Sequence, residues 1–248
     1  MVGQHPYAAA GSDLTIPPNL LLGTLPATLR QHLVARLEHV PLPRGMELWS
    51  PGEVLRHVYF PTSGLVSLAG TSPDGGSVEL AAIGHEGVLG LSLILQGDVT
   101  VHGARVQVAG AALRLHAREL EQVLRQHQSL QRVLLRWTHR LVTDISQAVV
   151  CHRYHHLMER LCSYLLRTAD QLHSDSLPLT HEAVAQALGV LRKTVTAAAV
   201  AAHDAGAIRY RHGRIVILDR SRLERSACGC YVTSRARRST RTARLASP

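Results

Sequence analysis

One stretch of the chain, residues 180–219, constrains its fold more than any other. The segment HEAVAQAL has the apolar spacing of a short helix and stops at Gly189, a residue that readily takes the left-handed backbone found after a helix end. A second helical run leads from Leu191 to Gly206, and two strand-like runs then flank His212-Gly213. Two helices joined by a tight turn and followed by a β-hairpin are the layout of a winged helix-turn-helix.

The second helix of this stretch is rich in alanine, which keeps it slim enough for a DNA major groove about 12 Å wide. Polar residues gather at its N-terminal end, the end from which a recognition helix reaches base edges. We therefore predict that the bases are read by Arg192, Lys193, Thr194 and Thr196. The residues predicted to hold the DNA backbone are Thr180, Arg209, Arg211 and Arg214.

The distribution of charge favours a polyanionic partner for the same part of the chain. The formal net charge is +9, and residues 180–248 carry all of it, because basic and acidic groups balance in the remainder. A neutral first part and a basic second part are typical of a protein whose second part binds nucleic acid. The partner we predict is double-stranded DNA.

Residues 46–116 have a different pattern of apolar and turn-forming residues. Short apolar or alternating runs, such as residues 57–60, 66–68, 78–81 and 106–108, are separated by turn signals rich in Pro and Gly. Strands of this length with a turn every 8–12 residues are typical of a β sandwich, barrel or jelly roll.

Helical spacing flanks this β region on both sides. Residues 24–40 repeat leucine every four positions, with Thr24 as a candidate cap. Residues 129–151 carry a heptad-like stripe, which fits either core packing or a two-stranded dimer helix. The stripe consists of Leu130, Leu134, Trp137, Leu141, Ile145 and Ala148. A further amphipathic helix is predicted over residues 157–172.

Three segments resemble the Crp/Fnr family of transcription regulators: LRHVYFPTSGLVSL (55–68), LPLTHEAVAQALGVLRKTV (177–195) and AGAIRYRHGRIVILD (205–219). The resemblance spans about residues 20–232. It implies an α+β fold with an N-terminal jelly-roll domain like that which binds cyclic nucleotides, a long dimerisation helix and a C-terminal winged helix-turn-helix. It also implies a homodimer, which assigns the heptad-like stripe to the dimer interface, a palindromic operator with half-sites one helical turn apart, and RNA polymerase as a further partner.

The domain boundaries expected from this resemblance and from composition are as follows: a flexible leader at 1–19, the β-roll at 20–127, the dimerisation helix at 128–152, the winged helix-turn-helix at 153–232 and a disordered basic tail at 233–248. The start of the chain lacks the features of a secretory signal, and no apolar run reaches the length of a membrane span. We expect a cytoplasmic protein.

The chain departs from the family pattern in both domains. Where the cyclic-AMP-binding branch has Ser-Arg-Glu-Thr-Val, this chain has Leu191-Arg192-Lys193-Thr194-Val195. Leu191 cannot cap a helix with its side chain, and Lys193 has no acceptor to offer cytosine, so the operator should differ. That branch also uses a Gly-Glu pair and a later Arg for the nucleotide, whereas here Leu91 follows Gly90 and Arg105 is displaced. We expect no response to cyclic AMP, and the effector stays unknown.

The cysteines and histidines indicate their roles less specifically than the segments above. Cys151 and Cys162 fit as small buried apolar groups, whereas Cys228 and Cys230 fit a redox pair or shared metal ligands. Because no second ligand pair follows at zinc-site spacing, and because His152, His155 and His156 lie among no acidic ligands, we expect no metal. No cysteine precedes Cys151, so an N-terminal iron–sulfur cluster is excluded within this sequence.

No catalytic constellation has support in the sequence, so we expect neither an enzyme nor a cofactor. The alternative to a sequence-specific regulator is a small-molecule or redox sensor that acts mainly through a protein partner and binds DNA weakly. The intact wing and the segregated positive charge favour the regulator.

Overall fold

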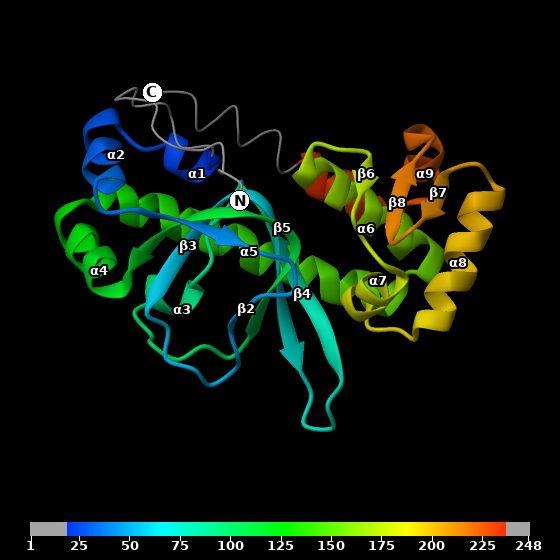
Figure 1. Cartoon of the computed structure of the whole chain (residues 1–248), viewed down its shortest axis with the longest axis horizontal. Coiled ribbons are helices and arrows are strands. Elements are labelled where there is room, and N and C mark those ends of the chain that lie inside the picture. Colours follow the sequence, from blue (N-terminus) through cyan, green and yellow to red (C-terminus); the bar gives the residue numbers. More distant parts are fainter. Residues whose placement is uncertain (1–18, 237–248) are drawn as a thin grey trace, which may run out of the picture.

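The computed structural model describes residues 19–236, so the predicted leader over residues 1–18 and the tail over residues 237–248 lie outside it. An antiparallel sheet with its helices forms the N-terminal domain, one long helix leads away from it, and a helical domain with a small sheet follows (Figure 1). This is the α+β architecture that the sequence predicted.

The N-terminal sheet contains the strand-like runs predicted within residues 46–116. Its strands are β1 (Glu38–Leu42), β2 (Glu47–Trp49), β3 (His57–Thr71), β4 (Ser77–Ile83) and β5 (Gly103–His116). They are antiparallel in the order β1-β5-β3-β4, and β2 pairs with the far end of β5. Valine, leucine and phenylalanine side chains alternate inward along β3, which places one face of this strand in the core.

The predicted turn at residues 61–64 is a bulge inside one long strand. The pairing of β3 with β5 shifts register between Pro61 and Ser63 and again before Leu65, while the strand continues. Gly64 has φ +77°, and a Cβ placed there would lie 2.5 Å from the carbonyl oxygen of Val108. The glycine is therefore needed because two backbones approach closely here. The sequence alone does not distinguish a glycine in this role from a glycine in a turn.

The first helices are shorter than predicted. Helix α1 spans Leu20–Gly23 and α2 spans Ala27–Val34, with Thr24 at the C-terminal end of α1. Residues 38–40 belong to β1, because pairing with β5 satisfies their backbone groups. Asn19, which we assigned to the leader, is buried: its side chain caps α1 and donates to the carbonyl oxygens of Pro61 and Gly87.

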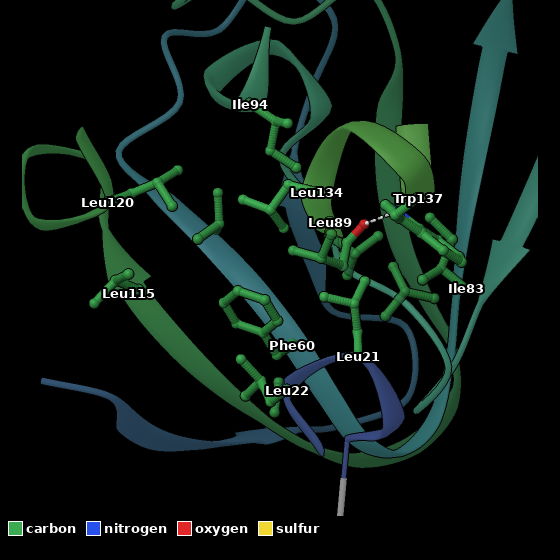
Figure 2. Packing of buried hydrophobic residues seen from close by; sticks show 14 of the residues in the cluster. Leu21, Leu22, Phe60, Ile83, Leu89, Ile94, Leu115, Leu120, Leu134 and Trp137 are labelled. Atoms are coloured by element: carbon green, nitrogen blue, oxygen red, sulfur yellow. Dashed lines mark hydrogen bonds between the residues drawn. The ribbon is translucent and has the colours of Figure 1, made fainter. Parts of the chain in front are cut away.

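Two shorter helices, α3 (Leu91–Ile94) and α4 (Ala117–Gln126), precede the long helix α5 (Gln128–Tyr154). One face of α5 packs into the N-terminal core (Figure 2). Leu134 and Trp137 lie among Phe60, Ile83 and Leu89, and the Trp137 indole donates to the carbonyl oxygen of Val88 at 3.1 Å. The long helix is thus part of the β-roll core over its first half.

The C-terminal domain follows the predicted order of helix, turn, helix and hairpin. Its elements are α6 (Leu157–Leu172), β6 (Ser176–Leu177), α7 (His181–Leu188), α8 (Arg192–Asp204), β7 (Ile208–Arg211), β8 (Arg214–Ile217) and α9 (Arg220–Ser226). The sheet order is β6-β8-β7, and His212 and Gly213 both have positive φ, as a two-residue hairpin turn requires. Residues 229–236 form a last helix, so the predicted disordered tail does not begin at residue 233.

The two domains are in direct contact. Gln171 of α6 donates to the carbonyl oxygen of Ala82 and to Glu86 Oε1, both at 2.8 Å, and Gln107 of β5 donates to the Tyr164 hydroxyl. Helix α7 packs beside β4 (Figure 1). Among the described residues, no helix is long and apolar enough to cross a membrane.

Candidate nucleic-acid interface

The turn between α7 and α8 is built as the sequence predicts. The Thr180 hydroxyl accepts the Ala183 amide at 3.1 Å and so caps α7. Gly189 ends α7 with φ +61°, and the Val190 amide bonds back to the Ala185 carbonyl oxygen. Leu191 precedes α8 without any side-chain cap, so the first amides of α8 receive no protein side chain there.

Helix α8 has one buried and one exposed face. Val195, Ala199 and Ala202 are buried against the rest of the domain, while Ala197, Val200 and Ala201 are exposed. The exposed face is therefore slim, and α8 lies at the outer edge of the molecule (Figure 1). A helix of this profile on an outer edge fits a groove about 12 Å wide.

Three of the four predicted base-reading residues project from the exposed end of α8. Arg192, Lys193 and Thr194 are exposed, and within the described part of the chain no hydrogen bond or ion pair holds the side chain of Arg192 or Lys193. Thr196 is different, because its half-buried hydroxyl donates to the Arg192 carbonyl oxygen at 3.0 Å and lies 3.1 Å from His181 Nδ1. Thr196 thus connects α8 to α7 and faces away from the exposed end.

The predicted backbone-binding arginines lie on the hairpin. Arg209 and Arg211 are exposed on the same face of β7, two residues apart. Arg214 is exposed at the start of β8 and donates to the Ser176 hydroxyl at 3.1 Å. Thr180 is half-buried at the start of α7, with its oxygen engaged by the cap.

One pair at this interface escaped the sequence reasoning. The His181 ring stacks on Tyr210, with ring centroids 3.9 Å apart and an interplanar angle of 30°. Burial lowers the pKa of His181 below its ordinary value of 6.5, and the nearby Arg192 guanidinium lowers it further. The pair joins α7 to the hairpin, a contact between residues far apart in sequence that no local pattern marks.

The predicted dimer-interface residues need correction. Leu130, Leu134, Trp137 and Leu141 are buried in the core of their own N-terminal domain, and Ile145 packs against that core. Ala148 is half-buried. Of the two readings of the stripe, intrachain packing applies to Leu130, Leu134, Trp137 and Leu141, because a side chain already enclosed by its own chain has no surface left for a partner. Ile145 and Ala148 are only partly buried and stay predicted interface residues.

A second face of α5, about 100° around the helix from the buried one, carries exposed apolar side chains at seven-residue spacing. Leu135, Val142 and Val149 are 44%, 52% and 66% exposed, and Val150 lies beside the last of them at 46%. Large exposed aliphatic residues in a row on one helix mark an unfilled contact surface. We call this set, Leu135, Val142, Val149 and Val150, the outer stripe of α5.

The β-roll contains a cavity of about 160 Å³ behind α3. Its lining is mainly apolar and includes Trp49, Leu68, Leu89 and Leu141, together with Thr100 and His102, and no Lys, Arg, Asp or Glu is among its lining residues. Burial lowers the pKa of His102, which keeps the imidazole neutral near pH 7. Arg105 does not line this cavity. It lies on β5, donates to the Gly45 carbonyl oxygen at 3.2 Å and lines a separate cavity of about 220 Å³ together with Glu79.

Known proteins resemble this chain in both domains. A model of the cyclic nucleotide-binding domain matches residues 39–127, and a model of the Crp-like helix-turn-helix domain matches residues 159–226. The global nitrogen regulator of Nostoc sp. is 26% identical over 167 residues, which cover 62% of this chain and 73% of that protein. The global nitrogen regulator of Synechocystis sp. is 25% identical over 167 residues and is covered to 72%.

Solved structures share the fold at low identity. FixK2 from Bradyrhizobium japonicum matches with a TM-score of 0.69 and 20% identity, over 78% of this chain and 98% of that one. The global regulator CLP of Xanthomonas campestris matches with a TM-score of 0.66 and 14% identity, over 78% of this chain and 100% of that one. With both domains matched in this order, the chain belongs to the Crp/Fnr family of transcription regulators.

Proposed function

We propose that this regulator is a homodimer that binds a specific, palindromic DNA operator through α8. The observation that carries the proposal is the exposed N-terminal end of α8, where Arg192, Lys193 and Thr194 project in the same domain as the exposed arginines of the hairpin. A free guanidinium on an exposed helix end matches the two acceptors of guanine in the major groove.

Each side chain has a distinct role in this proposal. Arg192 binds guanine through two parallel hydrogen bonds, and Lys193 binds a guanine or a phosphate. Thr194 contacts a phosphate or a thymine methyl group. The DNA backbone is held by Arg209, Arg211 and Arg214, and by Thr180, whose capping oxygen leaves its hydroxyl hydrogen free to donate.

The outer stripe of α5 supplies the proposed dimer contact. Its seven-residue spacing suits packing against the same helix of a second copy, and a two-fold axis makes the contact self-complementary. Two recognition helices related by that axis read half-sites about 34–36 Å apart.

The cavity behind α3 supports an effector other than cyclic AMP. A cyclic nucleotide brings a phosphate charge and a ribose hydroxyl, and the cavity offers neither a cation nor a carboxylate. RNA polymerase as a further partner and a cytoplasmic location complete the proposal, and both rest on the family membership.

The proposal is tested by titrating the full-length protein with operator DNA selected from a random pool, with fluorescence anisotropy as the readout. A specific regulator binds the selected DNA at least about 10³-fold more tightly than random DNA. Arg192→Ala should cost about 1–3 kcal/mol on the selected DNA and little on random DNA, because it removes a base contact. Arg211→Ala should weaken both alike and reduce the salt slope by about one, because it removes a phosphate contact.

Arg118→Ala is the matched control, since it removes one exposed positive charge from α4, in the other domain. It should leave the ratio of selected to random binding unchanged. Equal binding of wild type to both DNAs would contradict the proposal and favour a sensor that acts through a protein partner.

A further inference from the structure

Four side chains with metal-binding atoms meet where α5 ends. Cys151 lies in the last turn of α5 and His155 directly follows the helix, joined by the hydrogen bond from the His155 amide to the Cys151 carbonyl oxygen. Cys228 and Cys230 stand at the start of the last helix. The ligand atoms of all four lie within 4.8 Å of one another, the only such group of three or more found among residues 19–236.

The spacing of these atoms suits a tetrahedral ion. The sulfur atoms of Cys151 and Cys228 are 3.5 Å apart, and the Cys230 sulfur is 3.7 Å from His155 Nδ1. Zinc bonds of about 2.3 Å to sulfur and about 2.0–2.1 Å to nitrogen place two tetrahedral sulfur ligands about 3.8 Å apart and a sulfur and a nitrogen ligand about 3.6 Å apart. The four atoms are thus near the positions that one ion requires.

The donor set selects the class of metal. Three thiols and one imidazole, with no carboxylate among them, favour Zn²⁺ over Mg²⁺ or Ca²⁺. A site with four protein ligands leaves no open position for substrate, so such an ion has a structural or regulatory role.

Neighbouring groups support a charged cluster. The Ser163 hydroxyl lies 3.0 Å from the Cys228 sulfur and accepts the Cys228 amide, and Gln147 donates to the Cys230 sulfur at 3.2 Å. The guanidinium groups of Arg160 and Arg167 interact electrostatically with the cysteines, which offsets the net negative charge of three thiolates and one Zn²⁺.

We propose that Cys151, His155, Cys228 and Cys230 bind one Zn²⁺ ion. The sequence reasoning missed this site because the two ligand pairs lie far apart in the chain, with the whole winged helix-turn-helix between them. Residues 155 and 156 form the joint between α5 and α6, so the ion ties the last helix of the DNA-binding domain to α5 across that joint.

The test uses the full-length protein, purified under reducing conditions from zinc-supplemented cells and then desalted. About one zinc per protomer is expected by elemental analysis, in keeping with a single four-ligand site. Replacing the zinc with Co²⁺ should give the intense visible bands of a tetrahedral ion and near-ultraviolet charge-transfer bands from three thiolates. Cys230→Ser and Cys228→Ser should lower the affinity for Co²⁺ more than about 100-fold, since even outer-shell partners contribute about 10–100-fold.

Cys162→Ser is the matched control, because Cys162 is a buried thiol on α6 outside the cluster. It should retain the metal and the Co²⁺ spectrum. Circular dichroism of each variant separates loss of the ligand from loss of the fold, and the wild-type Co²⁺ titration decides the question if a variant fails to fold.

Two results would overturn the proposal. One is a fully reduced wild type that takes up neither zinc nor Co²⁺. The other is a Cys162→Ser variant that loses as much metal as Cys230→Ser. None of these readouts depends on DNA binding. A negative result for the zinc site therefore leaves the proposed operator recognition untested, and the reverse also holds.

Discussion

At the scale of single residues, the helix-turn-helix is held by side chains that also limit what can touch DNA. Thr196 was predicted to read bases, but its hydroxyl is engaged by the Arg192 carbonyl oxygen and lies against His181. Among residues 19–236, the side chains of Arg192 and Lys193 have no such partners. A polar residue near the start of a recognition helix therefore has two competing uses, and the packing of α7 decides between them.

His181 gives this arrangement a pH dependence. Its pKa in the folded chain lies below 6.5, so between these two values the unfolded chain binds a proton that the folded chain does not. The free energy of unfolding should therefore fall as the pH drops from about 6.5, and His181→Gln should reduce that slope. Thermal unfolding between about pH 7.5 and about pH 5 measures it.

The control for this measurement is His39→Gln, which changes an exposed histidine on β1. If His181→Gln and His39→Gln change the pH dependence of the unfolding free energy equally, burial does not lower the pKa of His181.

At the scale of elements, α5 has two faces with different tasks. The stripe through Leu130, Leu134, Trp137 and Leu141 anchors the helix in its own domain. The outer stripe of α5, one residue along from Leu134 and Leu141, stays exposed. Both have the same seven-residue repeat, so periodicity alone cannot say which one faces a second copy.

Substitutions on the two faces should separate these tasks. Val142→Asp should raise the dissociation constant of the dimer at least about 100-fold, because it places two carboxylates at the two-fold contact. Leu134→Ala should lower the free energy of unfolding by about 2–5 kcal/mol through a cavity in the core. Analytical ultracentrifugation and denaturant unfolding measure the two effects.

Val101→Asp provides the control, since Val101 is a 74% exposed valine of the β-roll and is not part of the outer stripe of α5. A Val142→Asp protein that remains dimeric would rule out the outer stripe of α5 as the interface.

At the scale of the whole molecule, the DNA-binding domain is docked on the β-roll of its own chain. Gln171 bridges α6 to the end of β4, and a Cβ at Gly189 would lie 3.2 Å from Val78 on β4. The turn before α8 thus rests on β4 of the N-terminal domain. We expect a movement of β4 to shift that turn, because the two are in direct contact.

Gln171→Ala should loosen this docking. The loss of a hydrogen bond worth about 1 kcal/mol should speed amide exchange at the contact about fivefold. Hydrogen–deuterium exchange over residues 78–83 and 186–190 measures it. Gln126→Ala, at the exposed end of α4, should change nothing there, and equal exchange in the two variants would contradict the docking role.

The sequence by itself determined the parts whose cause is local. Gly189 ends α7, Thr180 caps it, and His212-Gly213 closes the hairpin, because each follows from the backbone preference or side-chain chemistry of a few adjacent residues. Strand-like alternation also predicted the strands of the N-terminal sheet. Residues 61–64, which carry the Pro and Gly signals of a turn, instead form a bulge, and its register depends on the pairing of β3 with β5.

Only the tertiary structure decided the features that depend on distant partners. It showed which face of α5 is enclosed by the β-roll, that Thr196 faces α7, and that Cys151 and His155 meet Cys228 and Cys230. The physical reason is common to all three: a periodic pattern defines a helical face, whereas burial and ligand spacing depend on which remote segment packs against that face.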